Sequence, residues 1–308
     1  MMRFTKSHYW LSLCICILSL FVWPGRASCV SSVKAIGLVA VITDFGTTDF
    51  YIGAMQGAMY TVNPLVRIAT ITHEVEPFNV VEGSYILTQA AREFPSGTVF
   101  LAVVDPGVGT GRRPIVLQTR DEKLFVAPDN GLLTGVMEAF GVAHAYEITN
   151  RSLMRQGTIS ATFHGRDLYG PVAAHLSGGT KPSEVGPEIT DPVRLPIVKA
   201  RREEETLVGF VVHVDRYGNL ITNITGILAK EAGLVPGAQV CITIGEHRLS
   251  ATFTDTYNDV PKGDWLALVN AEHVVEIACN LANAARTIGA AAGAQLRVEL
   301  TQSPIAVK

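Results

Sequence analysis

The sequence IGLVAVIT at residues 36–43 begins the stretch that decides the fold. Helix-like and strand-like segments then alternate: FYIGAMQGAMYTVNP (50–64), RIATIT (67–72), VVEGSYILTQAAREFP (80–95) and GTVFLAVV (97–104). The short runs are rich in β-branched residues, and the longer ones place apolar residues at helical spacing. This order predicts an α/β fold whose mostly parallel sheet is covered by helices on both faces.

The pattern changes after the α/β region, which we expect to occupy residues 36–198. The run KARREEETL at 199–207 is highly charged, and we interpret it as a linker. The remainder, 208–303, consists of short strand-like pieces broken by Gly, Asn and Pro. This pattern of short strands and close turns predicts a small C-terminal β-barrel domain.

The N-terminus has the layout of a targeting segment. Arg3 and Lys6 precede an apolar run at 9–23, which is followed by Pro, Gly and small residues. We interpret residues 1–29 as a signal peptide or, alternatively, as an N-terminal anchor. The protein is therefore expected to be exported, either periplasmic or secreted, or to be held at a membrane.

Charge and cysteine content exclude several functional classes. The chain has 308 residues and a formal net charge of -3, with no basic run interleaved with aromatic residues, so nucleic acid is not an expected partner. Five cysteines are present, and Cys14 and Cys16 lie in the leader. The three others are scattered, which indicates neither a disulfide framework nor a CxxC metal site.

Polar residues directly follow three of the predicted strands. Asp44, His73 and Asp105 occupy these positions, where open α/β sheets bind ligands. A further segment, ATFHGRDLYGP, adds His164 to the candidates. Each residue alone could serve as a cap or turn residue, but the succession favours one site at the carboxyl edge of the sheet.

The loop DPGVGTGRR at 105–113 resembles a phosphate-binding loop only superficially. No Lys-Ser or Lys-Thr follows its last glycine, and Arg112 stands where the dinucleotide pattern needs glycine. The glycine turn can instead bring Asp105 and Arg112 together, either for catalysis or as a structural ion pair.

A metal-dependent hydrolase is an alternative, because carboxylates and imidazoles recur along the α/β region. The spacings HxH and HExxH are both absent, and so is the GxSxG motif of serine hydrolases. We therefore expect no metal and no cofactor. In this alternative, the metal ligands would be Asp44, His73, Asp105, His164 and Asp167.

Seven motifs in order resemble the S-adenosylmethionine hydroxide adenosyltransferase family, also called S-adenosylmethionine hydrolases, to which fluorinases and chlorinases are related. They are TDFGTTDFYIGAMQG, ITHEVEPFNVVEG, VVDPGVGTGRRPIV, FVAPDNGLLT, TFHGRDLYGPVAA, DRYGNLITNI and LALVNAEHVVEIACNLANAA. The resemblance implies hydrolysis of S-adenosylmethionine to adenosine and methionine. It also implies a homotrimer whose substrate lies between the α/β domain of one subunit and the barrel of its neighbour.

The resemblance also assigns roles to residues. It implies that Asp105, Arg112 and His164 position the attacking water and that Asp44 binds the ribose diol. Methionine would be held by Asp215 and Asn219. The full predicted substrate-binding set is Asp44, Asp49, His73, Asp215, Asn219, Tyr257 and Asn280, of which Tyr257 and Asn280 would contact adenine.

The sequence departs from the family at Ala271 and Glu272, which stand where many relatives carry small residues. How the carboxylate of methionine is held therefore stays open. Two alternative functions remain: a halide adenosyltransferase, and a non-catalytic nucleoside-binding protein. Asp105 disfavours the first, because a carboxylate repels a halide ion.

Overall fold

The computed structural model describes residues 1–2 and 34–301. The predicted leader, residues 1–29, lies outside the described residues apart from the first two. Within the described part of the chain, no helix combines the length and the apolar character needed to cross a bilayer.

The N-terminal part is built on a six-stranded sheet with the strand order β2-β1-β3-β5-β4-β6. All neighbouring pairs are parallel except those made by β4, which is antiparallel to both β5 and β6. The mostly parallel sheet predicted from the sequence is confirmed. Its strands are β1 (Leu38–Thr43), β2 (Arg67–Thr72), β3 (Val99–Val103), β4 (Pro114–Thr119), β5 (Leu124–Pro128) and β6 (Val142–Glu147).

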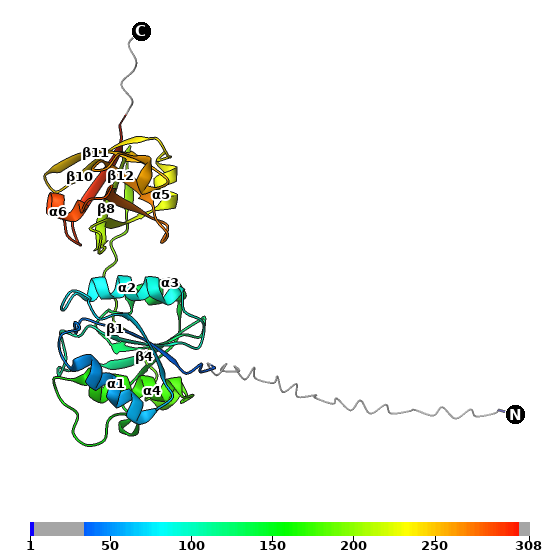
Figure 1. The fold of residues 1–308 in the computed structure, drawn as a ribbon. Helices are drawn as coiled ribbons and strands as arrows, with labels where there is room; N and C mark the ends of the chain where they lie inside the picture. Colours follow the sequence, from blue (N-terminus) through cyan, green and yellow to red (C-terminus); the bar gives the residue numbers. More distant parts are fainter. Residues whose placement is uncertain (3–33, 302–308) are drawn as a thin grey trace, which may run out of the picture. The chain divides into compact units, whose positions relative to one another are not determined.

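Helices cover both faces of this sheet, as Figure 1 shows. One face carries α1 (Tyr51–Val62) and α4 (Gly170–Ser177), and the other carries α2 (Val80–Arg92) and α3 (Thr134–Phe140). Residues alternate in direction along a strand, so β1 contributes to two separate apolar cores. Val39 and Val41 pack with α1, whereas Ala40 and Ile42 pack with α2.

The helix ends follow local sequence signals. In α2 the Asn79 side chain accepts a hydrogen bond from the backbone N–H of Glu82, which is a standard N-cap. Pro64 and Pro95 lie just beyond α1 and α2, as predicted, because proline cannot continue a helix. Short helical turns also occur at η1 (Arg151–Leu153), η2 (Gly165–Tyr169), η3 (Pro182–Glu184) and η4 (Tyr257–Asp259).

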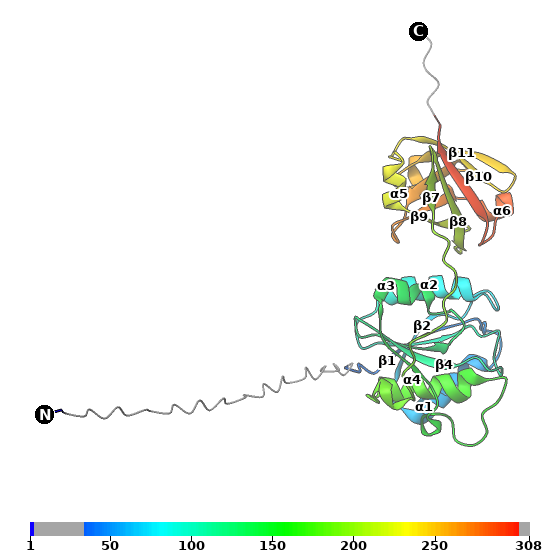
Figure 2. The same ribbon diagram turned by 180° about the vertical axis from the view of Figure 1, so that it is seen from behind.

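The C-terminal part is a β-barrel, as predicted (Figure 2). Seven strands follow one another in the order β14-β10-β11-β12-β13-β9-β8, and pairing of β14 with β8 closes the ring. Two short helices, α5 (Gly226–Glu231) and α6 (Ala284–Ile288), accompany it. The strands are β8 (Thr206–Val214), β9 (Leu220–Thr225), β10 (Gln239–Ile244), β11 (His247–Phe253), β12 (Trp265–Val269), β13 (Val274–Cys279) and β14 (Gln295–Leu300).

The charged run at 199–207, interpreted as a linker, forms a hairpin instead. Strand β7 (Arg201–Glu203) pairs antiparallel with β8, and Glu204 turns the chain with a φ of 52°. The two arginines and the glutamate of β7 tolerate this edge position because their charged side chains stay largely in water while the backbone pairs. The irregular connection lies earlier, at 190–200.

This connection is fastened to the α/β part by a buried carboxylate. Asp129, whose side chain is 2% exposed, accepts hydrogen bonds from the Arg113 guanidinium at 2.7 and 3.0 Å. It also accepts one from the backbone N–H of Val193 at 2.7 Å. The Asp129 carboxylate at the end of β5 therefore holds together the end of the 105–113 loop and the connection at 190–200.

We predict that Asp129→Ala lowers the free energy of unfolding by about 2 to 4 kcal/mol, because it leaves the backbone N–H of Val193 without its partner and leaves Arg113 paired with Asp191 alone. Urea denaturation measures the change. Glu138→Ala is the control, since Glu138 pairs with Arg194 on the surface and its loss should cost less than about 1 kcal/mol. Equal losses in both variants would contradict the anchoring role.

Candidate active site

A cavity of about 500 Å³ lies at the carboxyl edge of the parallel strands. Asp44 follows β1 and Asp105 follows β3, as the sequence predicted, and His164 reaches the same cavity from the segment before η2. The lining residues are Asp44, Phe45, Phe50, Tyr51, Pro77, Phe78, Val103, Asp105, Val108, Ser160, Thr162, Phe163, His164, Gly165 and Arg166.

Three of the predicted residues form one hydrogen-bonded group. Arg112 Nε donates to Asp105 Oδ1 at 2.7 Å, and Arg112 Nη2 donates to Asp105 Oδ2. The same Nη2 lies 3.2 Å from His164 Nδ1. The side chains of Arg112 and Asp105 are only 11% and 5% exposed. The glycine turn thus brings Asp105 and Arg112 together, and we call Asp105, Arg112 and His164 the triad.

The contact with Arg112 defines the protonation state of His164. A guanidinium can only donate, so Nδ1 of His164 accepts and the neutral ring carries its proton on Nε2. Burial lowers the pKa of His164, and the positive charge of Arg112 lowers it further, against smaller opposing effects of Asp105 and Asp167. His164 is therefore a neutral hydrogen-bond donor at neutral pH.

Asp44 is fixed by a strained loop. Its Oδ2 accepts a hydrogen bond from the backbone N–H of Phe78 at 3.0 Å, and Phe78 has a φ of 69°, which is rare for a residue with a side chain. Burial raises the pKa of Asp44, although the Phe78 hydrogen bond partly offsets this rise. The carboxylate lines the cavity, where hydroxyl donors could reach it.

Aromatic residues supply the apolar wall, which sequence reasoning missed. Phe45, Tyr51 and Phe163 meet edge to face at centroid distances of 5.4 to 6.2 Å. Phe50 and Phe78 also line the cavity but are 69% and 70% exposed. Exposed aromatic rings at the mouth of a cavity indicate a surface that binds an apolar or planar group. The sequence held one signal for this wall, since Phe45 directly follows Asp44 and Phe163 directly precedes His164.

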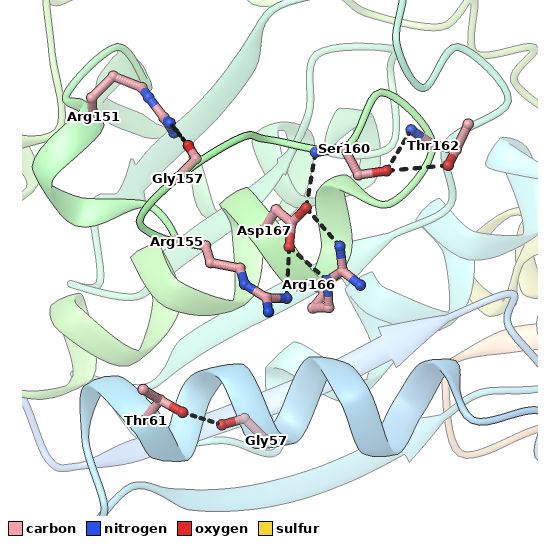
Figure 3. Close-up of polar contacts among 9 residues, drawn as sticks. All are labelled: Gly57, Thr61, Arg151, Arg155, Gly157, Ser160, Thr162, Arg166 and Asp167. Atoms are coloured by element: carbon pink, nitrogen blue, oxygen red, sulfur yellow. Dashed lines mark hydrogen bonds and ion pairs between the residues drawn. The ribbon is translucent and has the colours of Figure 1, made fainter.

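Asp167 belongs to the frame of the site and not to its cavity (Figure 3). It is fully buried and accepts hydrogen bonds from Arg166 at 2.6 and 2.8 Å, from Arg155 at 3.2 Å and from the backbone N–H of Ser160 at 2.9 Å. The Arg166 hydrogen bond is the main cause that lowers the pKa of Asp167 to about 2. A permanently charged Asp167 therefore fixes the 155–160 loop against η2.

Two predicted residues lie away from the cavity lining. The His73 ring is buried, and its Nδ1 lies 2.9 Å from the Thr43 hydroxyl. The backbone carbonyl oxygen of His73 accepts a hydrogen bond from the backbone N–H of Gly46, which holds the loop after β1. Asp49 is exposed in the same loop. Across residues 34–301, no three His, Cys, Asp or Glu side chains are grouped as metal ligands.

The predicted barrel residues have hydrogen-bond partners of their own, away from the cavity. Asp215 accepts hydrogen bonds from the Asn219 side chain at 3.1 Å and from the Asn219 backbone at 2.8 Å. The Tyr257 hydroxyl donates to Glu276 at 2.6 Å, and the Asn280 side chain donates to a backbone carbonyl. None of these residues lines the 500 Å³ cavity of the same chain. Glu276, which the sequence reasoning missed, is buried beside them.

Family models match both parts of the chain. The S-adenosylmethionine hydroxide adenosyltransferase N-terminal domain matches residues 39–186, and the corresponding C-terminal domain matches residues 209–297. The chain belongs to this family. The match places the triad within the N-terminal domain, and it places Asp215, Asn219, Tyr257 and Asn280 within the C-terminal one.

Relatives in the family carry two kinds of name. An (R)-S-adenosyl-L-methionine hydrolase of Salinispora tropica is 37% identical over 263 residues, covering 84% of this chain and 97% of its own. A fluorinase of Actinoplanes sp. is 27% identical over 289 residues, covering 85% and 97%. The crystal structure of an uncharacterized conserved protein from Thermotoga maritima is similar with a TM-score of 0.82 and 39% identity, covering 84% and 99%.

We predict that His164 titrates below the ordinary histidine pKa of 6.5, because burial and Arg112 both disfavour the imidazolium ion. Arg112→Gln should raise this midpoint, since it removes a neighbouring positive charge. NMR titration of the imidazole signals of the unmodified protein and of Arg112→Gln measures both values. A midpoint unaffected by Arg112→Gln would refute the assigned contact.

Proposed function

We propose that this protein hydrolyses S-adenosyl-L-methionine to adenosine and L-methionine. The observation that carries the proposal is the triad, with the Asp105 carboxylate and the His164 ring facing one cavity and Arg112 joined to both. Four relatives named (R)-S-adenosyl-L-methionine hydrolase, 32% to 37% identical, support the same reaction.

The reaction is an in-line displacement at the 5′ carbon of the ribose. A bond forms between water oxygen and this carbon, the carbon–sulfur bond breaks, and its electron pair leaves with the thioether sulfur of methionine. Asp105 accepts the proton of the water, because its carboxylate lines the cavity. The Nε2–H of His164 orients the oxygen, and the charge of Arg112 favours its hydroxide-like form.

The apolar wall suits this transition state. A sulfonium cation and a hydroxide-like nucleophile partly neutralise each other as they react, so a site that excludes water favours the charge-dispersed transition state. Phe45, Tyr51 and Phe163 surround the cavity with rings, while Asp44 supplies one carboxylate that can accept from both ribose hydroxyls. The site therefore combines a polar end for water with a largely apolar path for the substrate.

We further propose a homotrimer in which the barrel of a neighbouring subunit completes each site. The positions of two predicted barrel contacts support this arrangement, because Asp215 and Tyr257 line a surface different from the cavity that holds Asp44, Asp105 and His164. Light scattering coupled to gel filtration tests it, and a monomer with full activity would exclude it. The proposal also includes export of the protein, or its anchoring at a membrane, through residues 1–29. It further includes a reaction that needs neither a metal nor a cofactor.

Product analysis tests the reaction itself. The purified protein is incubated with S-adenosylmethionine and chelator, with and without chloride or fluoride, and the nucleoside is identified by mass. Adenosine formed without halide supports hydrolysis. A 5′-halogenated product would support halide transfer, the activity named for the fluorinase relatives, and no product despite binding would indicate a binding protein.

We predict that Asp105→Ala and His164→Ala each lower kcat by about two to four orders of magnitude, as loss of a general base or of a preorganised donor commonly does. Initial rates of adenosine formation measure the effect. The control is His144→Ala, which removes an exposed imidazole away from the cavity and should leave kcat unchanged. Near-normal turnover in both triad variants would overturn the mechanism.

We predict that Asp44→Ala raises KM more than it lowers kcat, because a ribose-diol contact contributes to binding before the reaction begins. Burial raises the pKa of Asp44, so the carboxyl becomes protonated at a higher pH than an ordinary aspartate. In the unmodified protein, KM should therefore rise as the pH falls through that raised pKa, and Asp44→Ala should remove this rise. A KM that keeps the same pH dependence in the variant would contradict the assignment.

A further inference from the structure

Tyr169 lies beneath the triad and touches two of its members. The ring is completely buried, and the Cζ atom of Arg112 lies 5.4 Å from its centroid. The His164 ring approaches the same ring at a centroid distance of 6.4 Å and an interplanar angle of 71°. One aromatic ring therefore supports the cationic and the imidazole side chain of the triad at once.

The π-helical turn η2 makes this double contact possible. His164 and Tyr169 are five residues apart, and in an α-helix such residues point about 140° away from each other. In η2 the backbone N–H of Gly170 donates to the carbonyl of Gly165, which widens the turn and brings residues five apart onto nearly the same face. His164 and Tyr169 thus share one side of the helix.

One glycine and one buried carboxylate stabilise the wide turn. A Cβ atom on Gly170 would lie 2.9 Å from the carbonyl oxygen of Gly165, so a side chain there would disturb the π-helical hydrogen bond. Asp167, in the middle of the turn, is held by Arg155, Arg166 and the backbone of Ser160, as Figure 3 shows. The turn is therefore a fixed support for the residues at its ends.

We propose that Tyr169 is a positioning residue whose ring holds the Arg112 guanidinium and the His164 imidazole in the geometry of the triad. The guanidinium already donates to Asp105, and its Cζ atom lies over the face of the Tyr169 ring, so the ring limits how far the guanidinium can move away from Asp105. This inference deepens the proposed hydrolase function and rests on it for the consequences for turnover. The effect on His164 itself does not depend on the substrate.

The role of the Tyr169 ring can be tested separately from the role of its hydroxyl. It is buried and has no hydrogen-bond partner among the residues the structure describes. A buried hydroxyl without a partner is unfavourable, so its removal should not destabilise the fold. Tyr169→Phe therefore keeps the ring and its contacts, and Tyr169→Leu removes the ring but retains an apolar side chain.

The experiment compares these two variants of the full chain with Leu176→Ala. Leu176 is a buried residue of α4 in the same apolar core, which makes it a control for general loss of packing. For each protein, we would measure the NMR titration of His164 without substrate, and kcat and KM for adenosine formation. Thermal unfolding of each variant reports its stability.

We expect Tyr169→Phe to retain kcat within about threefold and to melt at or above the temperature of the unmodified protein. Tyr169→Leu should lower kcat by at least about tenfold with KM nearly unchanged, because small displacements of a catalytic group are costly. It should also raise the midpoint of the His164 titration, since the Tyr169 ring contributes to the burial that lowers the pKa of His164. Leu176→Ala should melt earlier but keep the His164 midpoint.

Two outcomes would overturn the proposal. The first is a Tyr169→Leu protein that matches Leu176→Ala in both kcat and His164 titration, which would make Tyr169 an ordinary core residue. The second is a Tyr169→Phe protein as impaired as Tyr169→Leu, which would assign the role to the hydroxyl. If S-adenosylmethionine is not turned over at all, the proposed function fails, whereas the His164 titration still decides the role of Tyr169.

Discussion

The bidentate ion pair between Arg112 and Asp105 is the interaction on which the site depends. Both side chains are almost completely buried, so each charge requires the other. The glycine turn that joins them places the carboxylate at the end of β3, where the parallel sheet opens onto the cavity. From there the guanidinium reaches His164 and lies over Tyr169, so the polar edge of the sheet and the π-helical turn are joined through one arginine.

Much of the fold could be predicted from the sequence because the signals are local. β-branched runs, helix-ending prolines and residues that follow strands identified the parallel sheet, both of its first helices and the positions of Asp44 and Asp105. The hairpin within residues 199–207 was missed because a highly charged run is typical of a linker. Backbone pairing of β7 with β8 determines its structure instead. The charged side chains of this short hairpin lack the alternation of apolar and polar residues by which the other strands were recognised.

The site was predicted less completely, for a related physical reason. His164 and Arg112 are 52 residues apart, and only the fold shows that they share a hydrogen bond. The π-helical turn depends on a hydrogen bond between two glycines that no periodicity reveals, and the aromatic wall is assembled from separate loops. Residue type and position after a strand indicate candidates, but contact between side chains also requires the geometry of the turns.

The closure of the barrel has a consequence for how this chain is made. Strand β8 begins at Thr206, but the partner that closes the ring, β14, ends at Leu300. During synthesis, the edge of β8 that pairs with β14 therefore stays free until the segment 295–300 has emerged. Unpaired strand edges can associate with other chains, so the nascent barrel is open to misassembly during this interval.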